Sequence, residues 1–185
     1  AGDIFQIEKI AEGCWAALAK PLAIGNCNGA VFELSDGLLV VDTHARPSAA
    51  QAMFGQLRKQ VNKPVKYVVI THIHGDHTQG MAFYRKHAPQ AQFITHAATR
   101  KRMLEGGNPM TAVLSGREKL LAEAQQKLAA AANAKEKAYW QQVVDESKAF
   151  LAEMKTVTME PPAMTVTRDM VIHDKLQEIH IAHRG

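Results

Sequence analysis

The stretch Thr71-His72-Ile73-His74-Gly75-Asp76-His77 follows directly on the apolar run Val65-Lys66-Tyr67-Val68-Val69-Ile70. The apolar run has the length and composition of a buried strand, and Pro64 ends any helix before it. Three imidazoles and one carboxylate, all able to bind a metal, therefore lie within the six residues 72–77 after a strand end. Because rigid scaffolds place functional groups on such loops, this stretch is the candidate functional site.

The spacing within the stretch predicts metal ligands. His72 and His74 are two residues apart, so in an extended segment their side chains point to the same side. Imidazole nitrogen binds Zn, Fe, Ni or Cu. Gly75 permits a sharp turn before Asp76 and His77. We therefore expect His72, His74, Asp76 and His77 to form two pairs of ligands, which can serve two adjacent metal ions.

Strands and helices alternate around this loop. Residues 30–34 and 38–41 read as two strands joined by the turn Ser35-Asp36-Gly37, because Asp-Gly between apolar runs is a hairpin signal. Apolar residues at helical spacing predict a helix over 47–61. A second helix over 80–87 and a strand over 92–95 follow the stretch 71–77. This order of elements predicts an α/β protein.

The second part of the chain is helical and then returns to strands. Residues 98–158 are rich in Ala, Lys, Glu and Gln, and capping boxes at Ser115-x-x-Glu118 and Asn133-x-x-Glu136 predict helices over 116–132 and 134–155. The apolar stripe of the second helix indicates core packing, and the pattern leaves open whether the two helices fold back on each other. After the break at 160–162, two strands are expected over 170–173 and 176–182.

Composition excludes several classes of protein. Lys and Arg number 22 against 18 Asp and Glu, giving a net charge of +4, and Arg100-Lys101-Arg102 is the one tight basic cluster in the sequence. This balance predicts no nucleic-acid partner. No apolar run approaches the roughly 20 residues that a membrane span requires, so no membrane partner is expected. Cys14 and Cys27 are too few for a disulfide framework and are expected to be free thiols or one bridge.

The chain starts at Ala1-Gly2-Asp3 without a methionine. Removal of a secretory signal leaves such an end, and so does trimming of an expression tag. We therefore expect a periplasmic or secreted protein, with a cytoplasmic location as the alternative.

The pattern His72-x-His74-x-Asp76-His77 resembles the signature of the metallo-β-lactamase-fold superfamily. Val40–Thr43 resembles the family's early strand that ends in an aspartate, Lys63–Thr71 its lead-in to the metal loop, and Phe93–His96 its next strand. The resemblance implies an αββα sandwich of the α/β class. On this reading residues 1–185 are a single truncated domain, the first half of the sandwich, with residues 98–158 as a helical insertion.

The resemblance also implies roles for the loop residues. The residues matching His72 and His74 bind one zinc ion, and those matching Asp76 and His77 bind a second. Asp76 is implied as the catalytic residue that holds a hydroxide between the metals, and Asp42 as the residue that orients the loop by hydrogen bonds. The implied activity is zinc-dependent hydrolysis of an ester, lactone, amide or similar bond in a small-molecule substrate. Iron is the alternative metal, in a mononuclear iron oxygenase or a diiron oxidoreductase on the same fold.

The remaining histidines are weaker candidates. His44 and His96 either face the site from strand ends or are ordinary polar residues. His183 or His180 can stand in as a third ligand only if the last strand is shifted. His87 and His173 are expected to be structural or exposed.

The family's third histidine is expected just beyond the segment 178–185, where this chain ends. Catalytic zinc normally has three protein ligands, so we expect the isolated half to be inactive. Three explanations stay open: a fragment of a longer protein, a chain that pairs with a complementary second-half chain, or a homodimer. A non-catalytic half that assembles with another chain is the corresponding alternative function.

Overall fold

The computed structural model describes residues 4–20, 27–105 and 109–184. The chain divides into two compact units, one made of 1–106 with 159–185 and the other of 107–158. Each unit is considered by itself.

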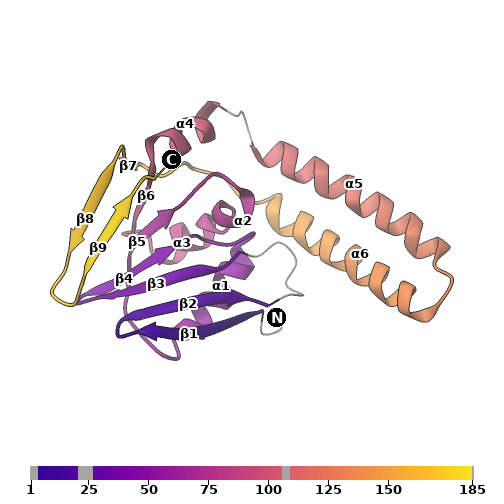
Figure 1. Cartoon of the computed structure of the whole chain (residues 1–185). Helices are drawn as coiled ribbons and strands as arrows, with labels where there is room; N and C mark the ends of the chain where they lie inside the picture. The colour runs from indigo at the N-terminus through magenta and orange to yellow at the C-terminus, as the bar shows by residue number, and fades with distance from the viewer. Residues whose placement is uncertain (1–3, 21–26, 106–108, 185) are drawn as a thin grey trace. The chain divides into compact units, whose positions relative to one another are not determined.

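The first unit is built on a seven-stranded mixed sheet whose strand order follows the chain from β1 to β7 (Figure 1). Its antiparallel half comprises β1 (Phe5–Ala11), β2 (Cys14–Ala19), β3 (Gly29–Leu34) and β4 (Gly37–Val41). Its parallel half continues from β4 through β5 (Val65–Ile70), β6 (Gln92–His96) and β7 (Met164–Val166). Because β4, β5 and β6 run parallel, the residues that follow them meet at one edge of the sheet.

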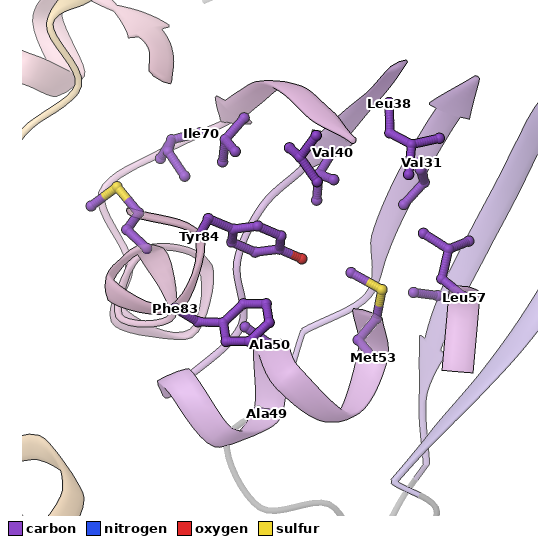
Figure 2. Packing of buried hydrophobic residues seen from close by; sticks show 14 of the residues in the cluster. Val31, Leu38, Val40, Ala49, Ala50, Met53, Leu57, Ile70, Phe83 and Tyr84 are labelled. Carbon is purple, nitrogen blue, oxygen red and sulfur yellow. The ribbon is translucent and has the colours of Figure 1, made fainter. Parts of the chain in front are cut away.

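Helices cover one face of this sheet. α1 (Pro47–Leu57) and α3 (Met81–His87) contribute buried side chains to the same core cluster as alternate residues of β3, β4 and β5. Figure 2 shows Met53 and Leu57 of α1 together with Tyr84 of α3, facing Val40 and Ile70 of the strands. α2 (Gly75–Thr78) is a single turn that precedes α3, and α4 (Ala97–Glu105) follows β6.

A β-hairpin lies on the second face of the sheet. β8 (Asp169–His173) and β9 (Glu178–Ala182) pair antiparallel and form a separate two-stranded sheet. Ile179 of β9 packs with Leu39, Val69 and Ile94, which alternate with the residues that face the helices. Both faces of the parallel strands are therefore buried, which explains why the strand 65–70 reads as a nearly continuous apolar run.

One carboxylate joins the turn of this hairpin to the turn between β3 and β4. The Ser35 amide and hydroxyl donate to the Asp174 carboxylate at 2.7 and 2.6 Å, and the Leu176 amide donates to it at 3.0 Å. The Ser35 side chain and these amides together lower the pKa of Asp174 to about 2. Asp174 thus holds the hairpin turn against the sheet.

The second unit is a helical hairpin of α5 (Pro109–Ala130) and α6 (Ala134–Met154) (Figure 1). The guanidinium of Arg117 lies 4.3 Å from the Phe150 ring centroid, and the ammonium of Lys127 lies 4.6 Å from that of Trp140. The start of one helix therefore meets the end of the other, so the two helices are antiparallel. Ala124, Val143 and Val144 are buried between them.

The expected elements are largely confirmed, with differences at their boundaries. The helix expected over 47–61 ends at Leu57. The helix start expected at Ser115 is wrong, because α5 begins at Pro109, a residue whose fixed φ suits a first helical turn. The capping box at Asn133 is confirmed: its side chain accepts a hydrogen bond from the Glu136 amide at 3.0 Å. The sequence pattern did not locate β1, β2, β7 or the single turn α2, and it gave no separate bounds for α4, most of which falls in the stretch from residue 98 that was expected to be helical.

No described helix is long and apolar enough to cross a membrane. The segment Ala1–Asp3, on which the expected secretory origin rests, lies outside the described residues.

Replacing Asp174 with asparagine is expected to loosen the β8–β9 turn. The folded pKa of Asp174 is lower than that of an unfolded aspartate, about 3.9. Its contribution to stability is therefore complete above about pH 4 and is lost as the pH falls through about 2. Hydrogen-exchange protection factors of the Ser35 and Leu176 amides should fall in Asp174→Asn at pH 5, and in the wild type between pH 5 and pH 2.

Asp36→Asn is the matched control, since Asp36 lies in the β3–β4 turn and pairs with Lys66 at 2.8 Å. It should leave the Ser35 and Leu176 amides protected. Unchanged protection of both amides in Asp174→Asn would refute the role given to this carboxylate.

Candidate metal centre

The candidate metal loop, residues 71–77, leaves the carboxyl end of β5 at the edge where the parallel strands end. His74 directly precedes α2, and Asp76 and His77 lie within that single turn of helix. The turn brings the Asp76 and His77 side chains back towards His72 and His74.

The structure brings the four expected ligands together. The ring centroids of His72 and His74 are 4.7 Å apart, and those of His72 and His77 are 4.0 Å apart. His72 Nε2 lies 3.1 Å from His74 Nδ1, and His77 Nε2 lies 3.6 Å from the Asp76 carboxylate. Burial, followed by the neighbouring imidazoles, lowers the pKa of His72, which favours the neutral ring that binds metal.

Asp42 fastens both ends of this loop. Asp42 is only 4% exposed, and its carboxylate accepts hydrogen bonds from the Thr71 amide at 2.9 Å and the Thr71 hydroxyl at 2.8 Å. The same carboxylate lies 2.7 Å from His77 Nδ1. A carboxylate only accepts here, so Nδ1 carries the proton and Nε2 of His77 keeps the lone pair that a metal can use.

The backbone after Asp42 supports the loop from beneath. The Thr43 amide and hydroxyl donate to the His77 carbonyl at 2.9 and 2.8 Å, and the Gly80 amide donates to the His44 carbonyl at 3.0 Å. A Cβ on Gly80 would lie 1.8 Å from the Thr43 carbonyl oxygen, so only glycine permits this approach. Asp42 and His44 have φ of 62° and 68°, left-handed values that residues other than glycine rarely adopt.

Cys27 and His44 form a buried pair behind the loop. The Cys27 thiol donates to the Asp76 carbonyl at 3.0 Å, and His44 Nδ1 donates to the Cys27 carbonyl at 3.0 Å. Burial lowers the pKa of His44 to about 4, and burial, followed by the charges of Asp42 and Asp76, raises the pKa of Cys27 to about 12. At neutral pH the ring is neutral and the thiol is protonated. His44 packs 4.4 Å from the Phe5 ring, so it lies in the core and not among the loop side chains.

His96 and His183 meet each other instead of the metal loop. Their rings stack with centroids 3.9 Å apart and an interplanar angle of 13°. His96 Nε2 also lies 3.3 Å from the Thr167 carbonyl. Within the described residues, no hydrogen bond or ring contact joins this pair to the loop imidazoles. His180 is on the hairpin and pairs with Glu178.

The donor set of the loop fits part of a metal centre. Imidazole nitrogen and carboxylate oxygen are the donors that zinc and iron accept. Across 4–20, 27–105 and 109–184, however, no group of three or more His, Cys, Asp or Glu side chains is arranged to hold one ion. In the described part of the chain the loop therefore gathers four donor groups that do not by themselves complete a site for one ion.

Comparison with known proteins identifies the family. Residues 23–161 match the sequence model of the metallo-beta-lactamase superfamily, and the chain belongs to this superfamily. A curated relative, the linear primary-alkylsulfatase of a Pseudomonas species, is 35% identical over 51 residues, which are 28% of this chain and 10% of that protein.

Solved structures to which this chain is similar include the metallo-beta-lactamase FIM-1 from Pseudomonas aeruginosa in its mono-zinc form. It is 21% identical to this chain, with a TM-score of 0.47, and the similarity covers 56% of this chain and 46% of that one. The metallo-beta-lactamase from Hirschia baltica is 20% identical, with a TM-score of 0.47 and coverage of 56% and 48%. The chain thus spans about half the length of these structures.

The predicted superfamily and α/β fold class are confirmed by the family match and by the mixed sheet with its helices. The roles expected for individual residues stay predictions. Sequence reasoning missed Thr43, Gly80 and Cys27 as supports of the loop. Gly80 carries the one available signal, a glycine placed between the loop and the following helix.

Gly80→Ala is expected to destabilise the fold by about 1–3 kcal/mol, because the added methyl group forces the Thr43 carbonyl away from the loop. Gly55→Ala is the matched control. Gly55 is exposed within α1 and a Cβ there meets nothing within 4 Å, so this change should stabilise by about 0.5–1 kcal/mol. Urea denaturation measures both, and equal midpoints for the two variants would contradict the packing described.

Proposed function

We propose that this chain supplies the metal-binding half of a metal-dependent hydrolase. The observation that carries the proposal is the loop in which three imidazoles and a carboxylate gather while the buried Asp42 carboxylate fastens its two ends. Membership of the metallo-beta-lactamase superfamily, which includes hydrolases, supports it.

On this proposal His72 and His74 hold one zinc ion, and Asp76 and His77 hold a second. Bound zinc lowers the pKa of a coordinated water to about 7 and stabilises negative charge that develops on the substrate. With zinc bound, Asp76 would be the residue that accepts a hydrogen bond from the water and orients it. Asp42 keeps the proton on His77 Nδ1, which directs the Nε2 lone pair to the metal.

Two protein ligands for each ion fall short of the three that a catalytic zinc normally has. We infer that the remaining ligands come from a longer form of this chain, from a complementary second-half chain or from a second copy. The isolated chain is then expected to lack turnover.

The substrate class we propose is a small molecule with an ester, lactone, amide or similar bond. The 51-residue similarity to an alkylsulfatase adds sulfate esters to the substrates that should be assayed. A periplasmic or secreted location stays part of the proposal.

Metal content per chain, measured by elemental mass spectrometry, is the first test. We expect one to two zinc ions on the wild type and loss of at least half of the metal in His74→Ala and Asp76→Ala. His87→Ala is the control, because His87 stacks on Phe83 at the end of α3 and not on the loop. Iron in place of zinc would favour an oxygenase or diiron oxidoreductase. Absence of metal from wild-type chain supplied with zinc would refute metal binding by this chain alone.

Asp42→Asn tests how the loop is oriented. The Thr71 amide donates to Oδ1 of Asp42 and His77 Nδ1 donates to Oδ2, so asparagine, which carries a donor in place of one of these oxygens, loses one of the two hydrogen bonds. Changes at such supporting residues typically weaken metal binding 10–100-fold. Zinc dissociation constants from chelator competition should rise by that factor. Asp36→Asn, in a distant turn, should leave zinc affinity unchanged, and equal affinities for all three proteins would overturn the role of Asp42.

A further inference from the structure

The peptide unit that links Asp76 to His77 is held on both sides. Its N–H, the amide of His77, donates to the His74 carbonyl at 3.0 Å. Its carbonyl, that of Asp76, accepts from the Cys27 thiol at 3.0 Å. This single peptide plane carries both proposed ligands of the second metal ion, so its tilt sets where both side chains point.

The hydrogen bonds that Asp42 and Thr43 make with the loop use other atoms, and the Asp76 carbonyl accepts from the Cys27 thiol. Asp42 binds the His77 ring and Thr71, and Thr43 binds the His77 carbonyl. The side chain of Asp76 is 42% exposed, and its carboxylate lies 3.6 Å from His77 Nε2. The orientation of the Asp76 carboxylate therefore depends on its backbone more than on packing around it.

Cys27 is itself fixed from a different part of the fold. Cys27 is buried, and its carbonyl accepts the hydrogen bond from His44 Nδ1. His44 is fully buried against Phe5, and its own carbonyl accepts from the Gly80 amide. Cys27, which lies before β3, thus contacts the Asp76 carbonyl within α2, and His44 contacts the Gly80 amide just after α2.

We propose that Cys27 is a positioning residue of the metal centre, whose thiol fixes the Asp76–His77 peptide and thereby the two ligands of the second metal ion. This inference rests on the proposed function and names a residue that neither the family match nor the metal-binding motif assigns. Cys27 does not touch the metal; it acts through the peptide carbonyl.

The experiment compares Cys27→Ala, Cys27→Ser and Cys14→Ser in the full 185-residue chain. Serine keeps a donor at position 27, while alanine removes it. Cys14 is the matched control, because its thiol contacts Gln177 at 3.5 Å, away from the loop. The first readout, made without metal, is hydrogen-exchange protection of the His77 amide. It should fall at least tenfold in Cys27→Ala and stay near the wild-type value in the other two variants.

The second readout is zinc affinity by chelator competition. Cys27→Ala should bind zinc about 10–100-fold more weakly, and Cys27→Ser should recover most of that loss. Val61→Ala controls for a general loss of stability, because Val61 is a buried core residue just before the opposite end of β5. It should leave zinc affinity unchanged. Wild-type affinity in Cys27→Ala, or an equal loss in Val61→Ala, overturns the positioning role.

A third readout needs no variant and covers the case in which Cys27→Ala does not fold. Ligand binding and loop order are reciprocal, so zinc that fixes Asp76 should slow alkylation of Cys27 by N-ethylmaleimide. Cys14 in the same sample should react at an unchanged rate. Equal rates for Cys27 with and without bound zinc overturn the proposal. If the wild type binds no zinc, the proposed function fails, while the His77 amide still decides whether Cys27 holds the loop.

Discussion

The buried carboxylate of Asp42 is the constraint on which the candidate metal centre depends. A carboxylate removed from water is costly unless hydrogen bonds compensate it. Here the Thr71 amide and hydroxyl and His77 Nδ1 provide that compensation. The same bonds that make burial of Asp42 tolerable hold the start and the end of the metal loop at fixed positions. The hydrogen bonds of Asp42 therefore both stabilise the edge of the sheet and fix the geometry of the loop.

The sheet explains why these groups meet. β4 and β5 are parallel neighbours, and the residues after Val41 and Ile70 leave the sheet at the same edge. The close approach of Gly80 to the Thr43 carbonyl then sets the distance between the two loops. Left-handed backbone at Asp42 and His44 is the cost of this arrangement. Such backbone is retained where the surrounding contacts hold it in place, and at this edge those contacts converge on the metal loop.

The sequence predicted the loop 71–77, the strand before it and Asp42 better than the contacts that surround them. The strand 65–70, the ligands after it and Asp42 follow from an apolar run, a donor pattern and a family resemblance, all of which are local. Contacts between segments far apart in sequence, such as that of Cys27 with Asp76 or of His96 with His183, have no local signature. β1 and β2 were not located because the alternation of apolar and polar residues in Phe5–Ala11 is short, and Cys14–Ala19 has no polar residues with which apolar ones could alternate.

The hairpin of β8 and β9 covers part of the second face of the sheet. Its inner residues bury the second face of the sheet, and Asp174 fastens its turn to Ser35. The sheet face that would otherwise be bare is therefore already partly covered by this chain. Its outer face carries polar residues such as His173 and His180, both of which pair with Glu178. A buried apolar core and a loop whose donor groups do not complete a metal site thus occur together in the described residues, since burial of apolar surface and convergence of ligands are separate requirements. If the loop holds metal ions as proposed, further ligands can therefore be supplied from elsewhere without rebuilding the fold around the loop.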